Sequence, residues 1–139
     1  MSVRIAIEED VLQATLLANR FAHEAYDPWV DDETIYESVV DTINNPDKVI
    51  LLYENKGFLA GVTHKFLLGN HLMAVELAWY VVPEARGEGV GKLLIESFED
   101  WAKIMGCKLI TMVSIDDEVG NYYKKLGYTL RERTYMKEI

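Results

Sequence analysis

Three glycines alternate along the chain at Gly87, Gly89 and Gly91, between a strand-like run and a strongly patterned helix. The strand-like run ends at Pro83, and the helical pattern begins close to Val90. A strand, a glycine-rich turn and a helix in this order gather backbone N–H groups at the helix N-terminus, where partial positive charge favours a phosphate or a diphosphate. Because glycine has no Cβ, the backbone can come close to such a ligand. The segment therefore predicts a site for a phosphorylated cofactor.

The spacing of these glycines excludes two familiar phosphate-binding loops. A dinucleotide fingerprint would place a glycine at position 92, where this chain has Lys92. A nucleotide-triphosphate loop would place a glycine at position 86 and Ser or Thr at position 93, but these positions are Arg86 and Leu93. An ordinary glycine-rich turn between a strand and a helix is the alternative.

The pattern Arg-x-x-Gly-x-Gly, read at Arg86, Gly89 and Gly91, resembles the coenzyme A pyrophosphate loop of the GCN5-related N-acetyltransferase (GNAT) family. The resemblance implies that backbone N–H groups of residues 87–92 bind the pyrophosphate, while main-chain groups of residues 80–82 bind the pantetheine arm. It implies acetyl-CoA or coenzyme A as the acyl-donor substrate. No metal is expected, because the three histidines do not have the spacing of metal ligands. The residues expected at the cofactor are Tyr80, Val81, Val82, Arg86, Gly87, Glu88, Gly89, Val90, Gly91, Lys92 and Asn121.

Hydrophobic periodicity divides the chain into ten elements. Strand patterns cover residues 3–7, 48–53, 58–68, 73–82, 109–115 and 128–137, and helical patterns cover 11–25, 31–43, 90–105 and 116–127. The order β-α-α-β-β-β-α-β-α-β predicts a single mixed α/β (α+β) domain over residues 1–139. Its sheet is expected to be mixed, mostly antiparallel, with about six strands flanked by about four helices. The GNAT family shows the same order, so the resemblance covers nearly the whole chain.

Two of these patterns also assign side chains to faces. Alternation in strand 73–82 places Glu76 on the same face as Tyr80 and Val82. The helix 11–25 is expected to bury one stripe of large apolar side chains, formed by Leu12, Leu16, Leu17 and Phe21.

Glu76 is the candidate general base. An acceptor amine has a free pKa of about 10, so it must lose a proton before it attacks a thioester. A carboxylate between Ala74 and Ala78 should be partly desolvated, which raises its pKa towards neutrality. Two alternatives remain open, namely that Glu76 lies on a solvated strand face or that it pairs with a nearby lysine or arginine.

The run from Tyr123 to Tyr128 resembles the later GNAT motif Tyr-x-Lys-x-Gly-Phe/Tyr. The resemblance implies that Tyr123 is the general acid that gives a proton to the departing thiolate. The alternative is an aromatic side chain that packs in the core. Asp116 stands where the family usually has Asn, and an ionised Asp accepts hydrogen bonds but does not donate them.

The net charge of −9 argues against nucleic acid as a partner, because nucleic acid demands positive surface. The charge would favour a cationic acceptor such as an amine, although acidity also keeps a protein in solution. The sequence contains no long uncharged apolar run, so no membrane span is expected. The N-terminus also lacks the apolar core of a signal peptide. A lone cysteine, Cys107, suits a reducing compartment, so a cytoplasmic protein is expected. Oligomeric state cannot be read from the sequence.

The leading hypothesis is acetyl transfer from acetyl-CoA to a primary amine by direct attack, without a covalent enzyme intermediate. The acceptor is then a small-molecule or peptide amine. The second hypothesis is a non-catalytic acyl-CoA-binding or regulatory module of the same fold. A nucleotide-binding domain is a third and weaker hypothesis. A nucleotide-triphosphate loop needs Ser or Thr after Gly91 and Lys92, but this chain has Leu93.

Overall fold

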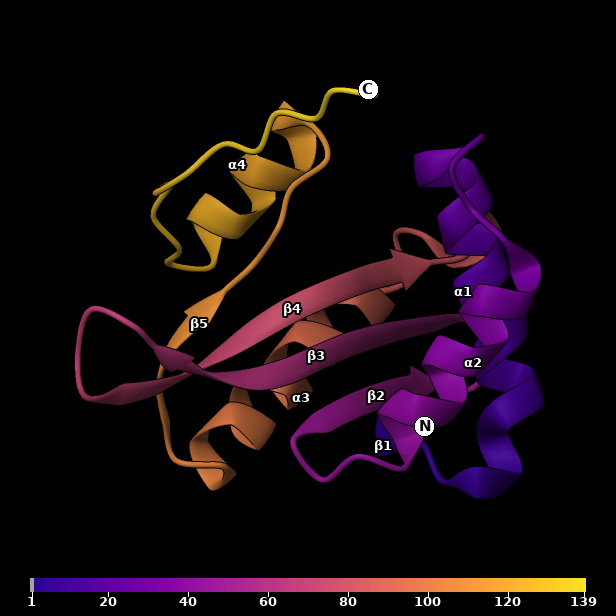
Figure 1. Cartoon of the computed structure of the whole chain (residues 1–139), viewed down its shortest axis with the longest axis horizontal. Helices are drawn as coiled ribbons and strands as arrows, with labels where there is room; N and C mark the ends of the chain where they lie inside the picture. The colour runs from indigo at the N-terminus through magenta and orange to yellow at the C-terminus, as the bar shows by residue number, and fades with distance from the viewer. Residues whose placement is uncertain (1) are drawn as a thin grey trace.

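A single five-stranded sheet in the order β1-β2-β3-β4-β5 forms the centre of the computed structural model, which describes residues 2–139 (Figure 1). All neighbouring strands are antiparallel except β4 and β5, which are parallel. The arrangement confirms the mixed, mostly antiparallel α/β fold with four α-helices. The strands are β1 (Arg4–Ile5), β2 (Lys48–Tyr53), β3 (Gly57–Phe66), β4 (His71–Val81) and β5 (Cys107–Thr111). The helices are α1 (Val11–Tyr26), α2 (Asp32–Ile43), α3 (Val90–Ile104) and α4 (Asp117–Lys125), with short 3-10 helices η1 (Glu8–Asp10) and η2 (Pro83–Ala85).

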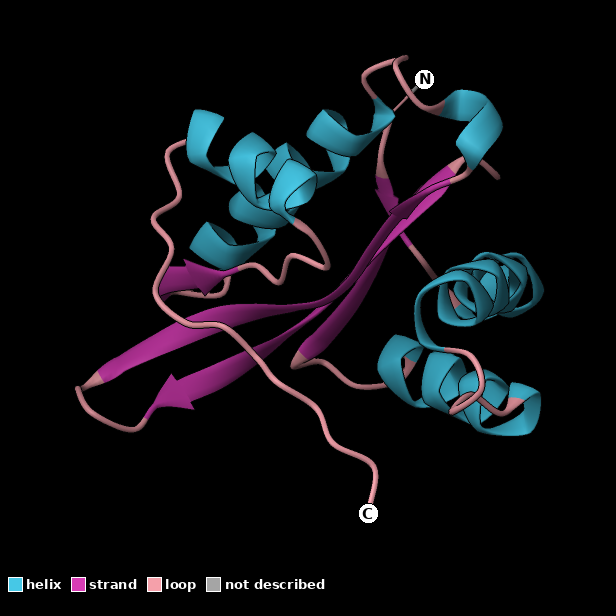
Figure 2. Cartoon of the chain, turned by 90° about the horizontal axis from the view of Figure 1, so that it is seen from above, coloured by secondary structure: helices cyan, strands magenta, loops and turns pink. Residues whose placement is uncertain are grey.

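Helices lie on both sides of the sheet (Figure 2). On one side, the apolar stripe of α3 and Tyr123 of α4 pack against β2, β3 and β4 in one buried cluster. On the other side, α1 and α2 pack against the same three strands in a second cluster. β2 is buried on both faces, since Leu51 belongs to the first cluster and Leu52 to the second. Within residues 2–139 no helix is both long and apolar enough to cross a bilayer.

The buried face of α1 differs from the expected stripe. Leu17 is buried, but Leu12 is 75% exposed and Leu16 is 67% exposed. The helix instead buries Val11, Ala14 and Ala22 with Leu17. Apolar side chains occur on two sides of this helix, so periodicity alone supports two stripes. The side with the small alanines is the one that packs against the sheet.

β4 contains a β-bulge that changes the alternation of its side chains. Ala60 of β3 pairs with Ala78 and Gly61 pairs with Glu76, so Leu77 has no partner. An extra residue in one strand breaks the strict two-residue period. Tyr80 therefore belongs to the cluster on the α1 side, whereas Glu76 contacts Tyr123 on the α3 side. The prediction that Glu76 shares a face with Tyr80 is wrong for this reason.

The predicted sixth strand over residues 128–137 does not form. Every side chain from 129 to 139 is exposed, and the segment has no regular secondary structure (Figure 1). β5 is consequently an edge strand, which is shorter than the predicted 109–115 and only partly buried. Alternating charged and uncharged residues fit a strand only where a neighbouring strand supplies hydrogen bonds and packing, and here none of the described residues does so.

Candidate active site

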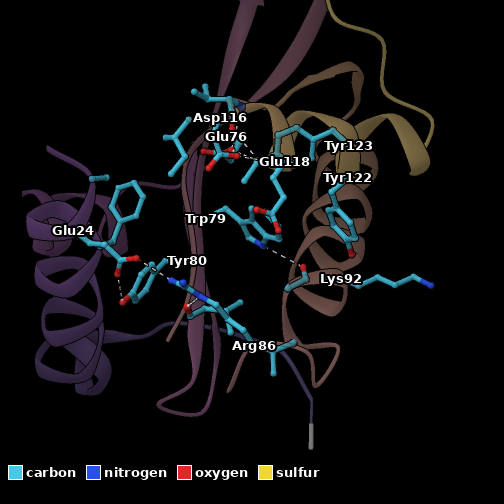
Figure 3. A pocket seen from close by; sticks show the side chains of 18 of the residues that line it. Glu24, Glu76, Trp79, Tyr80, Arg86, Lys92, Asp116, Glu118, Tyr122 and Tyr123 are labelled. Atoms are coloured by element: carbon cyan, nitrogen blue, oxygen red, sulfur yellow. Dashed lines mark hydrogen bonds and ion pairs between the residues drawn. The ribbon is translucent and has the colours of Figure 1, made fainter. Parts of the chain in front are cut away.

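A cavity of about 980 Å³ opens where β4 and β5 separate. The parallel pairing of the two strands ends at Val75 and Thr111, but β4 continues to Val81. Beyond Val75, no described strand pairs with the outer edge of β4. The cavity is lined by this part of β4, by the glycine turn and the start of α3, by α4 and by the end of α1 (Figure 3).

The open edge of β4 presents main-chain groups of Trp79 and Val81. The N–H of Val82 donates to the carbonyl of Lys56 at 2.9 Å, towards β3. Successive residues of a strand point their hydrogen-bonding groups to opposite sides, so Tyr80 also faces β3, and Val81 faces the cavity. The Arg86 Nε atom, which donates to the Val81 carbonyl at 2.9 Å, lies on that same open side. Of residues 80–82, only Val81 therefore has its main chain on the open edge, and Trp79 joins it.

The turn before α3 leaves backbone donors and space for an anion. Gly87 and Gly89 have φ angles of 89° and 87°, in the left-handed region that favours glycine. No atom lies within 4 Å of the position where a Cβ would stand at either residue. Gly89 caps α3 without a side-chain hydrogen bond, and the first N–H bonded within the helix is that of Leu93. The N–H groups of residues 90–92 thus have no partner within the helix, and this cradle fits a diphosphate.

Gly91 is required for a different reason. A Cβ at Gly91 would stand 2.7 Å from Cζ2 of Trp79, so the indole ring of Trp79 occupies the space of a side chain. The indole N–H of Trp79 also donates to the Gly91 carbonyl at 3.1 Å. On the other side, Trp79 stacks on Tyr122, with ring centroids 5.9 Å apart. Packing of β4 against α3 therefore fixes the third glycine of the motif.

The other residues predicted at the turn, Glu88, Val90 and Lys92, differ in whether they face the cavity. Lys92 lines the cavity. Glu88 does not line it and instead forms an ion pair with Lys56 at 3.3 Å. The Val90 side chain is buried in the core cluster on the α3 side, so only its main chain is available to a ligand.

Glu76 and Tyr123 lie in contact at the upper end of the cavity as drawn in Figure 3. The Tyr123 hydroxyl donates to Glu76 Oε1 at 3.3 Å and to the Val113 carbonyl at 2.9 Å. The Val113 N–H donates to the same Glu76 oxygen at 3.2 Å. Glu76 is only 3% exposed and has no ion-pair partner within residues 2–139, so both alternatives for it, a solvated strand face and a salt bridge, are wrong.

Burial sets the electrostatics of this pair. It raises the pKa of Glu76 from its ordinary value of 4.5 to about 7, although the hydrogen bonds from Val113 and Tyr123 act in the opposite direction. Burial and the neighbouring Glu76 charge raise the pKa of Tyr123 well above its ordinary value. Near neutral pH the pair thus combines a carboxyl group that can gain or lose a proton with a phenol that keeps its proton.

Arg86 lies at the other end of the cavity and connects the glycine turn to α1. Its Nη2 atom lies 3.1 Å from Glu24 Oε1, and its guanidinium carbon lies 5.6 Å from the centre of the Tyr80 ring. The Tyr80 hydroxyl donates to the other Glu24 oxygen at 2.8 Å (Figure 3). Sequence reasoning missed Glu24, because a single glutamate near the end of an amphipathic helix carries no distinctive pattern.

The family model described as "Acetyltransferase (GNAT) family" matches residues 9–128 of this chain. The chain belongs to the GNAT family. The family expected from the Arg86–Gly91 motif is thereby confirmed. The match includes both the glycine turn and Tyr123, where the resemblance was most specific.

One curated protein and two solved structures are among the proteins similar to this chain. The chain is 55% identical over 29 residues to "Aminoglycoside N(6')-acetyltransferase type 1" of Klebsiella aerogenes, which is 21% of this chain and 19% of that protein. A solved structure described as a probable acetyltransferase is similar with a TM-score of 0.80 at 21% identity, covering 100% of this chain and 98% of that one. The structure of AAC(6')-Iy with the bisubstrate analog CoA-S-monomethyl-acetylneamine is similar with a TM-score of 0.78 at 16% identity, covering 99% and 97%. At these identities the structural matches establish a shared fold.

One GNAT position departs from the usual residue, and the structure gives its local role. The Asp116 side chain caps α4 by accepting a hydrogen bond from the Val119 N–H at 2.9 Å. Asp and Asn are both strong N-cap residues, so the helix start tolerates either. Asp116 also lines the cavity, as does the exposed Asn121 on the first turns of α4. The roles of Asp116 and Asn121 towards a cofactor stay predictions.

Proposed function

We propose that this GNAT protein transfers the acetyl group of acetyl-CoA to a primary amine by direct attack of the amine nitrogen on the thioester. The observation that carries the proposal is that Glu76 and the turn before α3 line one cavity. A group able to accept a proton near neutral pH and a cradle suited to a diphosphate therefore open into the same space. GNAT membership and the names of the similar proteins support the same reaction class.

The cofactor site is proposed from the main chain. The N–H groups of residues 87–92 would hold the diphosphate of coenzyme A, in the partial positive field at the N-terminus of α3. The open edge of β4 at Trp79 and Val81 would pair with the amide groups of the pantetheine arm, in the manner of an added strand. Bound in this way, acetyl-CoA supplies an activated acyl group.

The proton chemistry is proposed for Glu76 and Tyr123. The Glu76 carboxylate takes the proton that the ammonium group loses, and the amine nitrogen forms a bond to the carbonyl carbon. The carbon–sulfur bond then breaks, and the nitrogen gives up its second proton to solvent as the amide forms. Tyr123, which stays protonated at neutral pH, gives its proton to the departing thiolate. The proton held by Glu76 then returns to Tyr123 along the hydrogen bond between them, and both groups are restored.

The acceptor is proposed to be a cationic amine, on a small molecule or a peptide. Carboxylate groups of Glu24, Asp116 and Glu118 line the cavity with Glu76, and such groups attract an ammonium group. The net charge of −9 acts in the same direction. Two of the similar proteins are named for aminoglycosides or bound to an aminoglycoside-derived analog, which makes aminoglycosides a first set of acceptors to test.

The proposed function is tested by titrating coenzyme A and acetyl-CoA into the protein in a calorimeter, with ATP as the control. We expect coenzyme A and acetyl-CoA both to bind and ATP to bind far more weakly. A panel of amines is then screened for release of coenzyme A from acetyl-CoA. Binding with no release by any amine would favour the non-catalytic acyl-CoA-binding module, and absence of binding would overturn the assignment.

The pH profile tests the Glu76–Tyr123 contact. Since Glu76 must be ionised to accept a proton, kcat/KM should fall on the acid side with an apparent pKa near 7. The Tyr123 hydrogen bond favours the ionised carboxylate, so Tyr123→Phe should move this limb to higher pH as well as lower kcat. Tyr36→Phe, on the exposed surface of α2, is the matched control. An acid limb at the same pH in Tyr123→Phe and in the wild type would contradict the contact.

A further inference from the structure

The strongest unexplained feature of the molecule is the network that joins Glu24 to Arg86. Arg86 belongs to the motif expected at the diphosphate, and it lines the cavity beside Gly87 and Gly89. Its guanidinium group is nevertheless held by partners within the protein. Nε donates to the Val81 carbonyl at 2.9 Å, and Nη2 donates to Glu24 at 3.1 Å. The positive charge of Arg86, next to the glycine turn in the chain, is therefore partly neutralised by a carboxylate of α1.

Glu24 is held in place for this contact. The Tyr80 hydroxyl donates to Glu24 Oε2 at 2.8 Å, while Arg86 contacts Oε1. These two hydrogen bonds lower the pKa of Glu24, so the carboxylate is ionised at neutral pH. Tyr80 itself is buried between Phe21 and Phe58, which fixes its ring. The Glu24 carboxylate is thus held by a tyrosine whose ring is fixed in the sheet.

The side chains of the ion pair remain half-exposed, with Arg86 at 50% and Glu24 at 49%. An ion pair of this exposure contributes little to stability, so it can break without unfolding the protein. A diphosphate at the glycine turn would offer the guanidinium a stronger, doubly charged partner, because Arg binds phosphate through two parallel hydrogen bonds. Glu24 and the diphosphate would then compete for the Arg86 guanidinium group.

We propose that Glu24 is a positioning residue that competes with the cofactor's diphosphate for Arg86 and so weakens coenzyme A binding. This inference depends on the proposed function, because it assumes that coenzyme A occupies the turn. Binding of the cofactor transfers Arg86 from Glu24 to the diphosphate. The Glu24 carboxylate is then released into the cavity, of which α1 forms part of the lining.

The test is a calorimetric titration of coenzyme A into the wild type and four variants. Glu24→Gln keeps the shape of the side chain and the hydrogen bond from Tyr80 but removes the charge. We expect coenzyme A to bind to this variant about twofold to fivefold more tightly than to the wild type, the range that corresponds to a half-exposed ion pair. Glu84→Gln is the matched control, since it removes the same charge two residues from Arg86, where Glu84 pairs with Arg20 instead. The control should show a smaller gain.

Two further proteins separate competition from general electrostatics. Arg86→Gln should bind coenzyme A more weakly than the wild type, and adding Glu24→Gln to it should give no further gain. An unchanged or weaker affinity in Glu24→Gln would overturn the inference, and so would a gain that persists without Arg86. If coenzyme A does not bind to the wild type at all, the proposed function fails and this inference fails with it. Normal binding with no effect of Glu24→Gln removes this inference alone.

Discussion

Replacing Glu76 with glutamine should lower kcat by about 10²- to 10⁴-fold, the usual contribution of a positioned general base. The amide oxygen of glutamine can still accept the hydrogen bond from the Val113 N–H, which is 3.2 Å from Glu76 Oε1. The amide cannot accept the proton of an ammonium group, so binding of acetyl-CoA should change little. The measurement is kcat at saturating acetyl-CoA and amine, with coenzyme A affinity determined by calorimetry.

The control for this variant is Glu37→Gln, which removes a carboxylate from the exposed surface of α2. It should leave kcat unchanged. A kcat of Glu76→Gln equal to that of the wild type, at the same affinity for coenzyme A, would show that Glu76 is not the base. The loss of both kcat and affinity would instead show that the variant disturbs the cavity.

The same variant gives a signature in stability. Folding raises the pKa of Glu76 from 4.5 to about 7, so the folded protein binds this proton more tightly than the unfolded chain. The stabilising contribution is therefore complete below pH about 4.5 and is lost as the pH rises through about 7, by an amount on the order of 3 kcal/mol. Glu76→Gln does not titrate and should lack this part of the pH dependence, which denaturant unfolding at several pH values would detect.

Replacing Phe98 with alanine should lower the free energy of unfolding by about 3–5 kcal/mol. Phe98 is fully buried at the centre of α3, where it stacks on Trp101 with ring centroids 5.8 Å apart. Its ring also occupies the space beside Gly61, where any Cβ would overlap with it. Because Gly61 pairs with Glu76 across the bulge, the cavity left by the substitution borders the strand that carries the proposed base. Kcat should therefore fall as well, even where the variant remains folded.

The matched control is Leu93→Ala on the same helix, whose side chain is 42% exposed. It should cost about 1 kcal/mol or less, since little apolar area leaves water at this position on folding. Denaturant unfolding curves for both variants give the comparison. Similar losses in the two variants would contradict the position of Phe98 at the centre of the core.

Local signals in the sequence predicted most of the fold. Strand 48–53 was bounded correctly because Asn45 and Pro46 stop the preceding helix and the turn at residues 55–57 follows. The start of α3 could be predicted from the glycines at 87–91, because they mark a turn between a strand pattern and a helical pattern. Tyr123 could be selected as a candidate because it occurs in a motif that resembles the family, and Glu76 because it is a carboxylate between apolar neighbours within a strand. Their direct contact could not be read from residues that lie 47 positions apart.

Non-local features escaped prediction for identifiable reasons. The bulge at Leu77 depends on the register between two strands, and strict alternation cannot reveal an unpaired residue. The buried side of α1 depends on which apolar stripe meets the sheet, and Leu12 and Leu16 lie on the other side. The segment 128–137 carries a strand-like pattern, but a strand forms only when a partner edge accepts it.

The bulge at Leu77 divides one strand between two tasks. Upstream of it, Glu76 contacts Tyr123 of α4, where we propose that a proton is transferred. Downstream of it, Tyr80 contacts Glu24 of α1, which in turn binds Arg86. Mutations in α1 can consequently change the lining of the cavity without moving the Glu76 carboxyl group. One stretch of backbone thereby contributes to two walls of the cavity that can change separately.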